Sequence, residues 1–112
     1  QIGVLLFERG NLPYSIAAFE MVLARCPPPA EVARRATNNL ARAYVAEDRL
    51  ADAERLLRAG RAAWPDDPKQ LANLMRVVAR RGRHAEAHAL LQELQRRFPT
   101  YLEKRDRIQV GP

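Results

Sequence analysis

The sequence predicts an all-α fold, built from three antiparallel helix hairpins and a C-terminal capping helix. Alanine, leucine, arginine and glutamate, all good helix formers, dominate its 112 residues, and β-branched residues never alternate over a strand-length run. Apolar residues recur at helical spacing, as Leu40, Ala41 and Tyr44 do. The chain also repeats itself at a nearly constant interval, which predicts that the hairpins stack into an α-solenoid within one domain, residues 1–112.

Each repeat has a turn residue in its middle and a proline at its end. The turn residues are Gly10, Asp48 and Gly82, and the closing prolines are Pro27, Pro65 and Pro99. In both sets the successive members are 38 and 34 residues apart. Other positions keep this register: Ile2 with Leu40 and Leu74, Leu6 with Tyr44 and Val78, Ser15 with Ala53 and Ala87, and Phe19 with Leu57 and Leu91. Repeat one therefore covers residues 1–29, repeat two 30–67, repeat three 68–99, and the cap helix 100–112.

The first repeat predicts helices over about residues 1–8 and 13–25, joined by a turn at 9–11. Pro13 suits a helix start, where its missing amide hydrogen is no loss. The prolines at 27–29 force an extended break, because each proline disfavours helix at the residue before it. The chain starts at Gln1, without an initiator methionine and within a predicted helix, so we expect it to be a piece of a longer protein.

The second repeat predicts helices over about residues 30–47 and 50–63. Three polar residues at 47–49 join them, and so short a connection requires the two helices to pack antiparallel. We expect Asp48 to cap the second helix, because its carboxylate can accept amide hydrogens of the first turn. That helix carries a stripe of Leu50, Ala53, Leu57, Gly60 and Trp64. Gly60 should cost about 1 kcal/mol relative to alanine in a helix interior.

The third repeat predicts helices over about residues 68–81 and 84–97. We expect Asp67 to cap the first of them, with Pro68 at its first position and Gln70 reaching back to the cap. Thr100 and Glu103 form a capping-box pattern, which predicts a short helix from there to about residue 109. The mixture of apolar and charged residues in this tail suits an end cap with a polar outer face.

A period of 34 residues, with small residues where helices cross, a glycine at the turn and a closing proline, is similar to the tetratricopeptide repeat family. The third repeat carries the resemblance best, through Gly82, Ala87, Leu91 and Pro99. The resemblance extends from Gln1 to about Pro99, and implies a right-handed superhelix whose first helices line an inner surface that binds proteins. Three departures from the family pattern are Ser15, Gly60 and Met75.

The predicted inner surface is basic and rich in amides. Opposite and beside the core-facing direction of helices 30–47 and 68–81 lie Arg35, Asn38, Asn39, Arg42, Lys69, Asn73, Arg76 and Arg80. None is a carboxylate. Arginine can grip a carboxylate with its fork, and asparagine can bond a ligand backbone. We therefore predict a non-catalytic scaffold or adaptor that binds an acidic or extended protein segment here; the alternative is a solvated face with binding elsewhere.

Some tetratricopeptide repeat proteins grip a C-terminal carboxylate through a five-residue clamp, which we expect to be absent. Asn39 and Lys69 match two of its sites. Asn73 and Val4 stand where arginine and asparagine are expected, and the remaining site precedes Gln1.

The net charge of +6 leaves two further functions open. Of the 19 basic residues only Lys69 and Lys104 are lysines, and such a balance favours anionic partners in general. Genome composition and solvated helix faces explain the arginines equally well. Nucleic-acid binding is one alternative, although inward-facing aromatics for base stacking are missing. A purely architectural role, in which the hairpins join further repeats or self-associate through the truncated first helix, is the other.

Few residues suggest catalysis or metal binding. His84 and His88 have a spacing that can bind zinc, but His84 corresponds to Leu12 and Leu50, so we expect a histidine packed between helices. Cys26 is the single cysteine, with no paired histidine and no disulfide partner. No glycine-rich phosphate loop, signal peptide or membrane-length apolar run occurs. We expect no enzymatic activity, metal or cofactor, and the compartment stays open.

Overall fold

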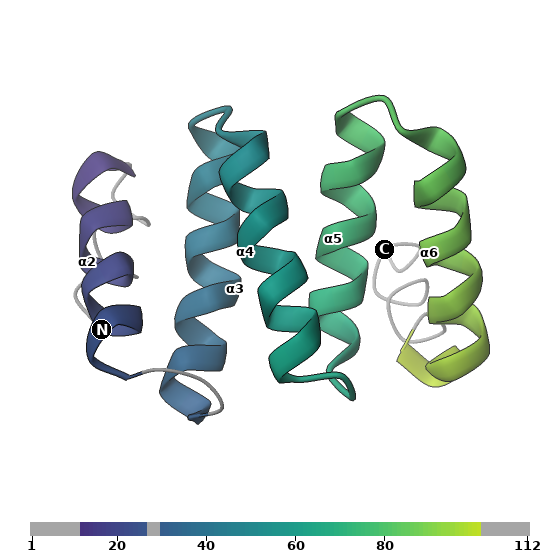
Figure 1. The fold of residues 1–112 in the computed structure, drawn as a ribbon, viewed down its shortest axis with the longest axis horizontal. Helices are drawn as coiled ribbons and strands as arrows, with labels where there is room; N and C mark the ends of the chain where they lie inside the picture. Colours follow the sequence, from purple (N-terminus) through teal and green to yellow (C-terminus); the bar gives the residue numbers. More distant parts are fainter. Residues whose placement is uncertain (1–11, 27–29, 102–112) are drawn as a thin grey trace, which may run out of the picture.

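Five helices pack in chain order in the part of the protein that the computed structural model describes, residues 12–26 and 30–101. They are α2 (Leu12–Arg25), α3 (Glu31–Ala46), α4 (Leu50–Ala63), α5 (Pro68–Arg80) and α6 (His84–Arg97). Each helix contacts the next, and the five stand side by side in a row (Figure 1). The described residues contain no strand. The prediction of an all-helical fold is confirmed.

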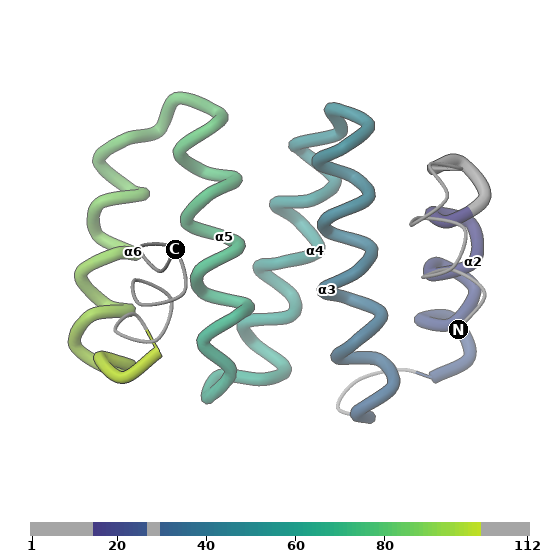
Figure 2. The backbone as a smooth tube through the Cα atoms, turned by 180° about the vertical axis from the view of Figure 1, so that it is seen from behind, coloured from purple at the N-terminus to yellow at the C-terminus, as the bar shows by residue number. Residues whose placement is uncertain are grey.

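The helices α3 and α5 share one face of the row. They contact each other as well as α4. Seen from behind, both lie in front of α4 (Figure 2). The residues predicted to line the inner surface therefore belong to two helices that contact each other.

The α3–α4 and α5–α6 turns have the same backbone geometry. Asp48 and Gly82 both adopt a left-handed conformation, with φ of +60° and +86°. The next amide, of Arg49 or Arg83, donates back to a carbonyl of the preceding helix, which closes a Schellman motif. The prediction that Asp48 caps α4 is wrong: Arg49 is the N-cap and makes no side-chain capping bond, because Asp48 is used to end α3.

The start of α5 follows its prediction. Asp67 is the N-cap, its carboxylate accepts a hydrogen bond from the amide of Lys69 at 3.0 Å, and Pro68 occupies the first turn. Gln70 also turns back, but its Nε2 donates to the Asp67 side chain at 3.5 Å and to Asn38 Oδ1 at 3.0 Å. Its amide thus joins α5 to α3.

Residues at corresponding repeat positions are buried, as the predicted register requires. Those that the structure describes are Ser15, Phe19, Leu40, Tyr44, Ala53, Leu57, Leu74, Val78 and Ala87. Leu91 is half-buried instead, and the buried stripe of α6 consists of Ala87, Leu90 and Leu94. Among the described helices, α6 packs mainly on α5, whereas α4 packs on both α3 and α5.

The helix ends differ little from the predicted ones. The bounds of α4 and α6 agree with prediction, and α3 and α5 end within one residue of it. Residues 99–101 are already helical, so Thr100 lies inside a helix and is not its cap. The predicted helix over residues 1–8 and the rest of the cap helix lie outside the described residues. None of the described helices has both the length and the apolar character that a membrane span requires.

Candidate functional site

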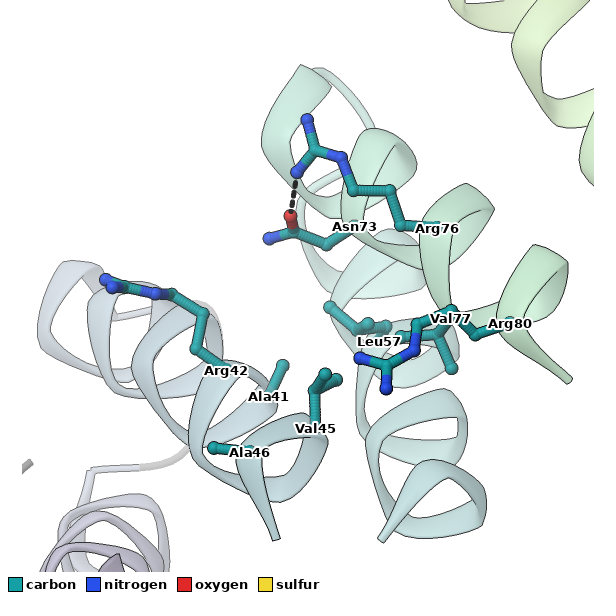
Figure 3. A pocket seen from close by; sticks show the side chains of 9 residues that line it. All are labelled: Ala41, Arg42, Val45, Ala46, Leu57, Asn73, Arg76, Val77 and Arg80. Carbon is teal, nitrogen blue, oxygen red and sulfur yellow. Dashed lines mark hydrogen bonds between the residues drawn. The ribbon is translucent and has the colours of Figure 1, made fainter. Parts of the chain in front are cut away.

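A cavity of about 510 Å³ lies between α3 and α5, with α4 behind it (Figure 3). Its volume falls within the range of about 300–1,000 Å³ typical of ligand pockets. Its lining residues are Ala41, Arg42, Val45 and Ala46 of α3, Leu57 of α4, and Asn73, Arg76, Val77 and Arg80 of α5. The cavity therefore combines an apolar interior with polar side chains from two neighbouring helices.

The cavity occupies the C-terminal halves of α3 and α5, because their N-terminal ends are bridged. Arg34 Nη1 donates to Asp67 Oδ2 at 2.9 Å, and one turn further along each helix Gln70 Nε2 donates to Asn38 Oδ1 at 3.0 Å. Beyond these bridges α3 presents the small side chains of Ala41 and Ala46. Small side chains facing a neighbouring helix leave space that larger ones would fill.

The polar part of the lining is cationic. Three arginines line the cavity, and none of its nine lining residues is a carboxylate. Arg76 Nη1 donates to Asn73 Oδ1 at 3.0 Å. This arrangement can accept negative charge, because each guanidinium can form paired hydrogen bonds with a carboxylate.

The three arginines point in different directions in Figure 3. Arg42 and Arg76 extend away from the cavity, whereas Arg80 reaches from α5 across Val77 into it, toward Val45. Within the described part of the chain, the Arg80 guanidinium forms no hydrogen bond or ion pair. Leu57 has 0 % of its surface exposed although it lines the cavity.

The structure brings together half of the residues predicted for the inner surface. Those that line one cavity are Arg42, Asn73, Arg76 and Arg80. Asn38 is instead held by Gln70, and Arg35 is exposed beside Glu31, with Nε and Oε1 3.6 Å apart. Lys69 is exposed on the first turn of α5 and Asn39 is half-buried, and neither lines the cavity.

Reasoning from the sequence missed the apolar half of the site. Ala41, Val45, Leu57 and Val77 belong to the hydrophobic core or pack against it, and they also line the cavity. Helical periodicity marks such residues as core, since it gives the direction of a side chain and not the distance to the next helix. The sequence does carry one signal of this cavity, which is the pair of small residues at positions 41 and 46.

Most carboxylates of the described region are engaged elsewhere, and two of them join α4 to α6. Arg58 Nη2 lies 2.7 Å from Glu86 Oε2, and Arg61 Nη2 lies 2.5 Å from Glu93 Oε1. Neither carboxylate lines the cavity. These ion pairs join helices at equivalent places in neighbouring repeats, and they leave the cavity without negative charge.

Glu54 is the most densely paired carboxylate. Only 10 % of its side chain is exposed, and it accepts hydrogen bonds from Arg58 Nε at 2.9 Å, Arg81 Nη1 at 2.7 Å and Arg83 Nη1 at 3.0 Å. Burial disfavours the charged carboxylate, but the hydrogen bonds from the three arginines outweigh it and lower the pKa of Glu54 to about 2. Glu54 therefore ties α4 to the α5–α6 turn as an ionised group at neutral pH.

A second, more open hollow of about 610 Å³ lies beside the α4–α5 connection. It is lined by Glu31, Arg34, Ala63, Trp64, Pro65, Asp66, Asp67 and Pro68. Three carboxylates and one arginine make it unsuitable for an anionic ligand. The cavity between α3 and α5 is therefore the better match to the predicted basic surface.

The two histidines lie on the surface of α6. His84 and His88 are both exposed, so the prediction that His84 packs between helices is wrong. The cause is the position of His84 at the first residue of α6, beside an exposed turn. Among the described residues no group of three or more potential metal ligands occurs.

Comparison of the sequence with models of known protein families finds no match, and comparison with curated proteins finds no significant similarity.

Proposed function

We propose that this chain is a segment of an α-solenoid similar to the tetratricopeptide repeats, and that it serves as a non-catalytic scaffold. In this proposal an acidic, extended segment of a partner protein binds in the groove between α3 and α5, the first helices of two successive hairpins. The observation that carries the proposal is the cavity at that place, with three arginines and no carboxylate in its lining.

Two features support the repeat architecture. Residues at corresponding positions, such as Leu40 with Leu74 and Tyr44 with Val78, are buried in both repeats. Asp48 and Gly82, at the two equivalent turns, share a left-handed conformation and the same pattern of closing hydrogen bonds. A shared turn geometry at a separation of 34 residues is typical of repeats whose units stack in the same way.

The groove would recognise its ligand by charge and by backbone contacts. Arg42 and Arg76 are exposed at its rim, where positive charge accelerates association and where a negative charge in its place would repel an acidic segment. Asn73 can bond a peptide backbone, because its side chain has both a donor and an acceptor. The scaffold itself is held by the bridges between α3 and α5, so the ligand meets a preformed surface.

Charge reversal tests the proposal. Arg42→Glu combined with Arg76→Glu should abolish binding of the partner in a pull-down, and weaken binding of a capped hexaglutamate peptide at least tenfold in an NMR titration. A matched control, Arg25→Glu with Arg96→Glu, reverses two exposed arginines outside the cavity and changes the net charge by the same amount. If the groove variant binds the peptide as tightly as the control variant does, the binding surface lies elsewhere.

A further inference from the structure

We infer that Arg80 makes the groove selective for acidic segments in which an apolar side chain stands beside a carboxylate. This inference rests on the proposed function of the groove and specifies its ligand class. In this arrangement the apolar side chain enters the cavity and the neighbouring carboxylate pairs with the Arg80 guanidinium.

The interior of the cavity is apolar. Apart from its polar residues, the cavity is lined only by Ala41, Val45, Ala46, Leu57 and Val77. Val45 is half-buried and Ala46 is exposed, so part of this apolar surface faces solvent. An entering aliphatic side chain would remove that surface from water, whereas a purely acidic peptide would leave it hydrated.

Arg80 differs from the other lining residues in where its charged end lies. Its side chain runs along Val77 into the cavity, so that its methylene stem lies on apolar surface while the residue as a whole remains exposed to solvent (Figure 3). Within the described residues that end has no carboxylate partner. A ligand carboxylate would supply one, and the apolar side chain that enters with it would displace water and so strengthen this charge-assisted hydrogen bond.

The other two arginines of the lining differ from Arg80 in direction. Arg42 and Arg76 point away from the cavity, so they can attract an acidic segment without touching a group that has entered. Removing either should slow association and reduce its salt dependence. Removing Arg80 should instead speed dissociation and erase the preference for a carboxylate beside the apolar side chain.

Three capped pentapeptides test the inference on the 112-residue chain: Glu-Glu-Leu-Glu-Glu, Glu-Glu-Ala-Glu-Glu and Gln-Gln-Leu-Gln-Gln. Their affinities are measured by NMR titration for the wild type, for Arg80→Met, which keeps an apolar stem without charge, and for Arg96→Met. Arg96 is an exposed arginine of α6 outside the cavity, so its variant controls for the loss of one charge. Thermal unfolding verifies that each variant is folded.

We expect the wild type to bind the acidic leucine peptide about tenfold more tightly than the acidic alanine peptide, and about tenfold more tightly than the glutamine peptide. In Arg80→Met the preference for leucine should remain while the preference for glutamate falls to about twofold. Arg96→Met should behave as the wild type does.

Two outcomes contradict the inference in distinguishable ways. If the wild type binds the leucine and alanine peptides equally, or if Arg80→Met loses no more than Arg96→Met, the inference about Arg80 is wrong while the acidic groove remains. If no acidic peptide binds, or if the shifted resonances lie outside α3 and α5, the proposed function is wrong and the inference falls with it.

Discussion

Replacement of Gly60 by alanine should destabilise the protein, although helix propensity alone favours the replacement by about 1 kcal/mol. Gly60 is buried on α4, and a Cβ atom built there would lie 2.3 Å from Gln70 Oε1 and 3.1 Å from Gln70 Cδ. Gln70 has 0 % of its surface exposed, and its Nε2 donates to Asn38. The amide therefore cannot move aside without giving up its hydrogen bond between α5 and α3.

The magnitude follows from the two opposing contributions. Displacing a buried amide from its hydrogen bond costs about 1–3 kcal/mol, and the gain in helix propensity returns about 1 kcal/mol, so Gly60→Ala should lose about 1 kcal/mol net. If Gln70 is first replaced by alanine, only Thr37 Cγ2, at 3.2 Å, still presses on the new methyl group. Gly60→Ala should then be neutral or stabilising, which is a coupling of about 1–2 kcal/mol between the two sites.

The assay is denaturant unfolding of the four chains of this double-mutant cycle, followed by far-UV circular dichroism. Ala62→Gly, at an exposed position of the same helix, serves as the propensity control. It should cost about 1 kcal/mol whether or not Gln70 is present. If Gly60→Ala changes the free energy of unfolding equally in both backgrounds, the contact between Gly60 and Gln70 does not govern this interface.

Three further predictions concern the turns, the Glu54 network and nucleic acid. Gly82→Ala should lower the free energy of unfolding by about 1 kcal/mol, because φ is +86° and the new Cβ would contact nothing within 4 Å that could offset the strain. Asp48→Gly should raise the free energy of unfolding by about 0.5 kcal/mol, because glycine adopts a positive φ without strain. Calorimetry in which both variants change the stability in the same direction would refute this. Because the pKa of Glu54 falls from 4.5 to about 2 on folding, its ionised form stabilises the protein above pH 4.5, and this contribution is lost as the pH falls to about 2. Glu54→Gln should therefore cost about 2 kcal/mol at pH 7, allowing for solvent screening of the partly exposed arginines, and the stability difference from wild type should shrink toward pH 2 in urea titrations. Single-stranded RNA should bind weakly at physiological salt, since no aromatic residue lines the cavity; a fluorescence titration with submicromolar affinity and a steep salt slope would favour the nucleic-acid alternative.

Local patterns in the sequence predicted the elements well. The bounds of α4 and α6 and the cap of α5 at Asp67 follow from signals within a few residues of each other. The buried faces of α3 and α5 follow from helical periodicity, because one side of an amphipathic helix must pack against its neighbour. Such features depend on neighbours along the chain, which the sequence displays directly.

Features that depend on distant partners were missed or assigned another role. Gly60 looks unfavourable in its own helix and becomes necessary only because Gln70 packs against it from α5. Arg80 could be assigned to the inner surface, but its turn into the cavity depends on the space left by small residues of α3. A helical projection gives the direction in which each side chain leaves its helix. It gives neither the rotamer of the side chain nor the width of the gap between two helices.

One signal of long range was nevertheless present in the sequence, and it bears on function. The bridges from Arg34 to Asp67, from Asn38 to Gln70 and from Arg61 to Glu93 join residues 33, 32 and 32 apart, close to the repeat period. Complementary residues at that separation lie on neighbouring repeats, and two of these three pairs neutralise an arginine. Arg80 stands 33 residues after Glu47 and 32 residues after Asp48, yet it lines the cavity and pairs with neither of them. Repeat spacing thus identifies possible bridges between neighbouring repeats, whereas the structure shows that Arg80 forms none within the described residues, and this is why we expect it to bind a ligand.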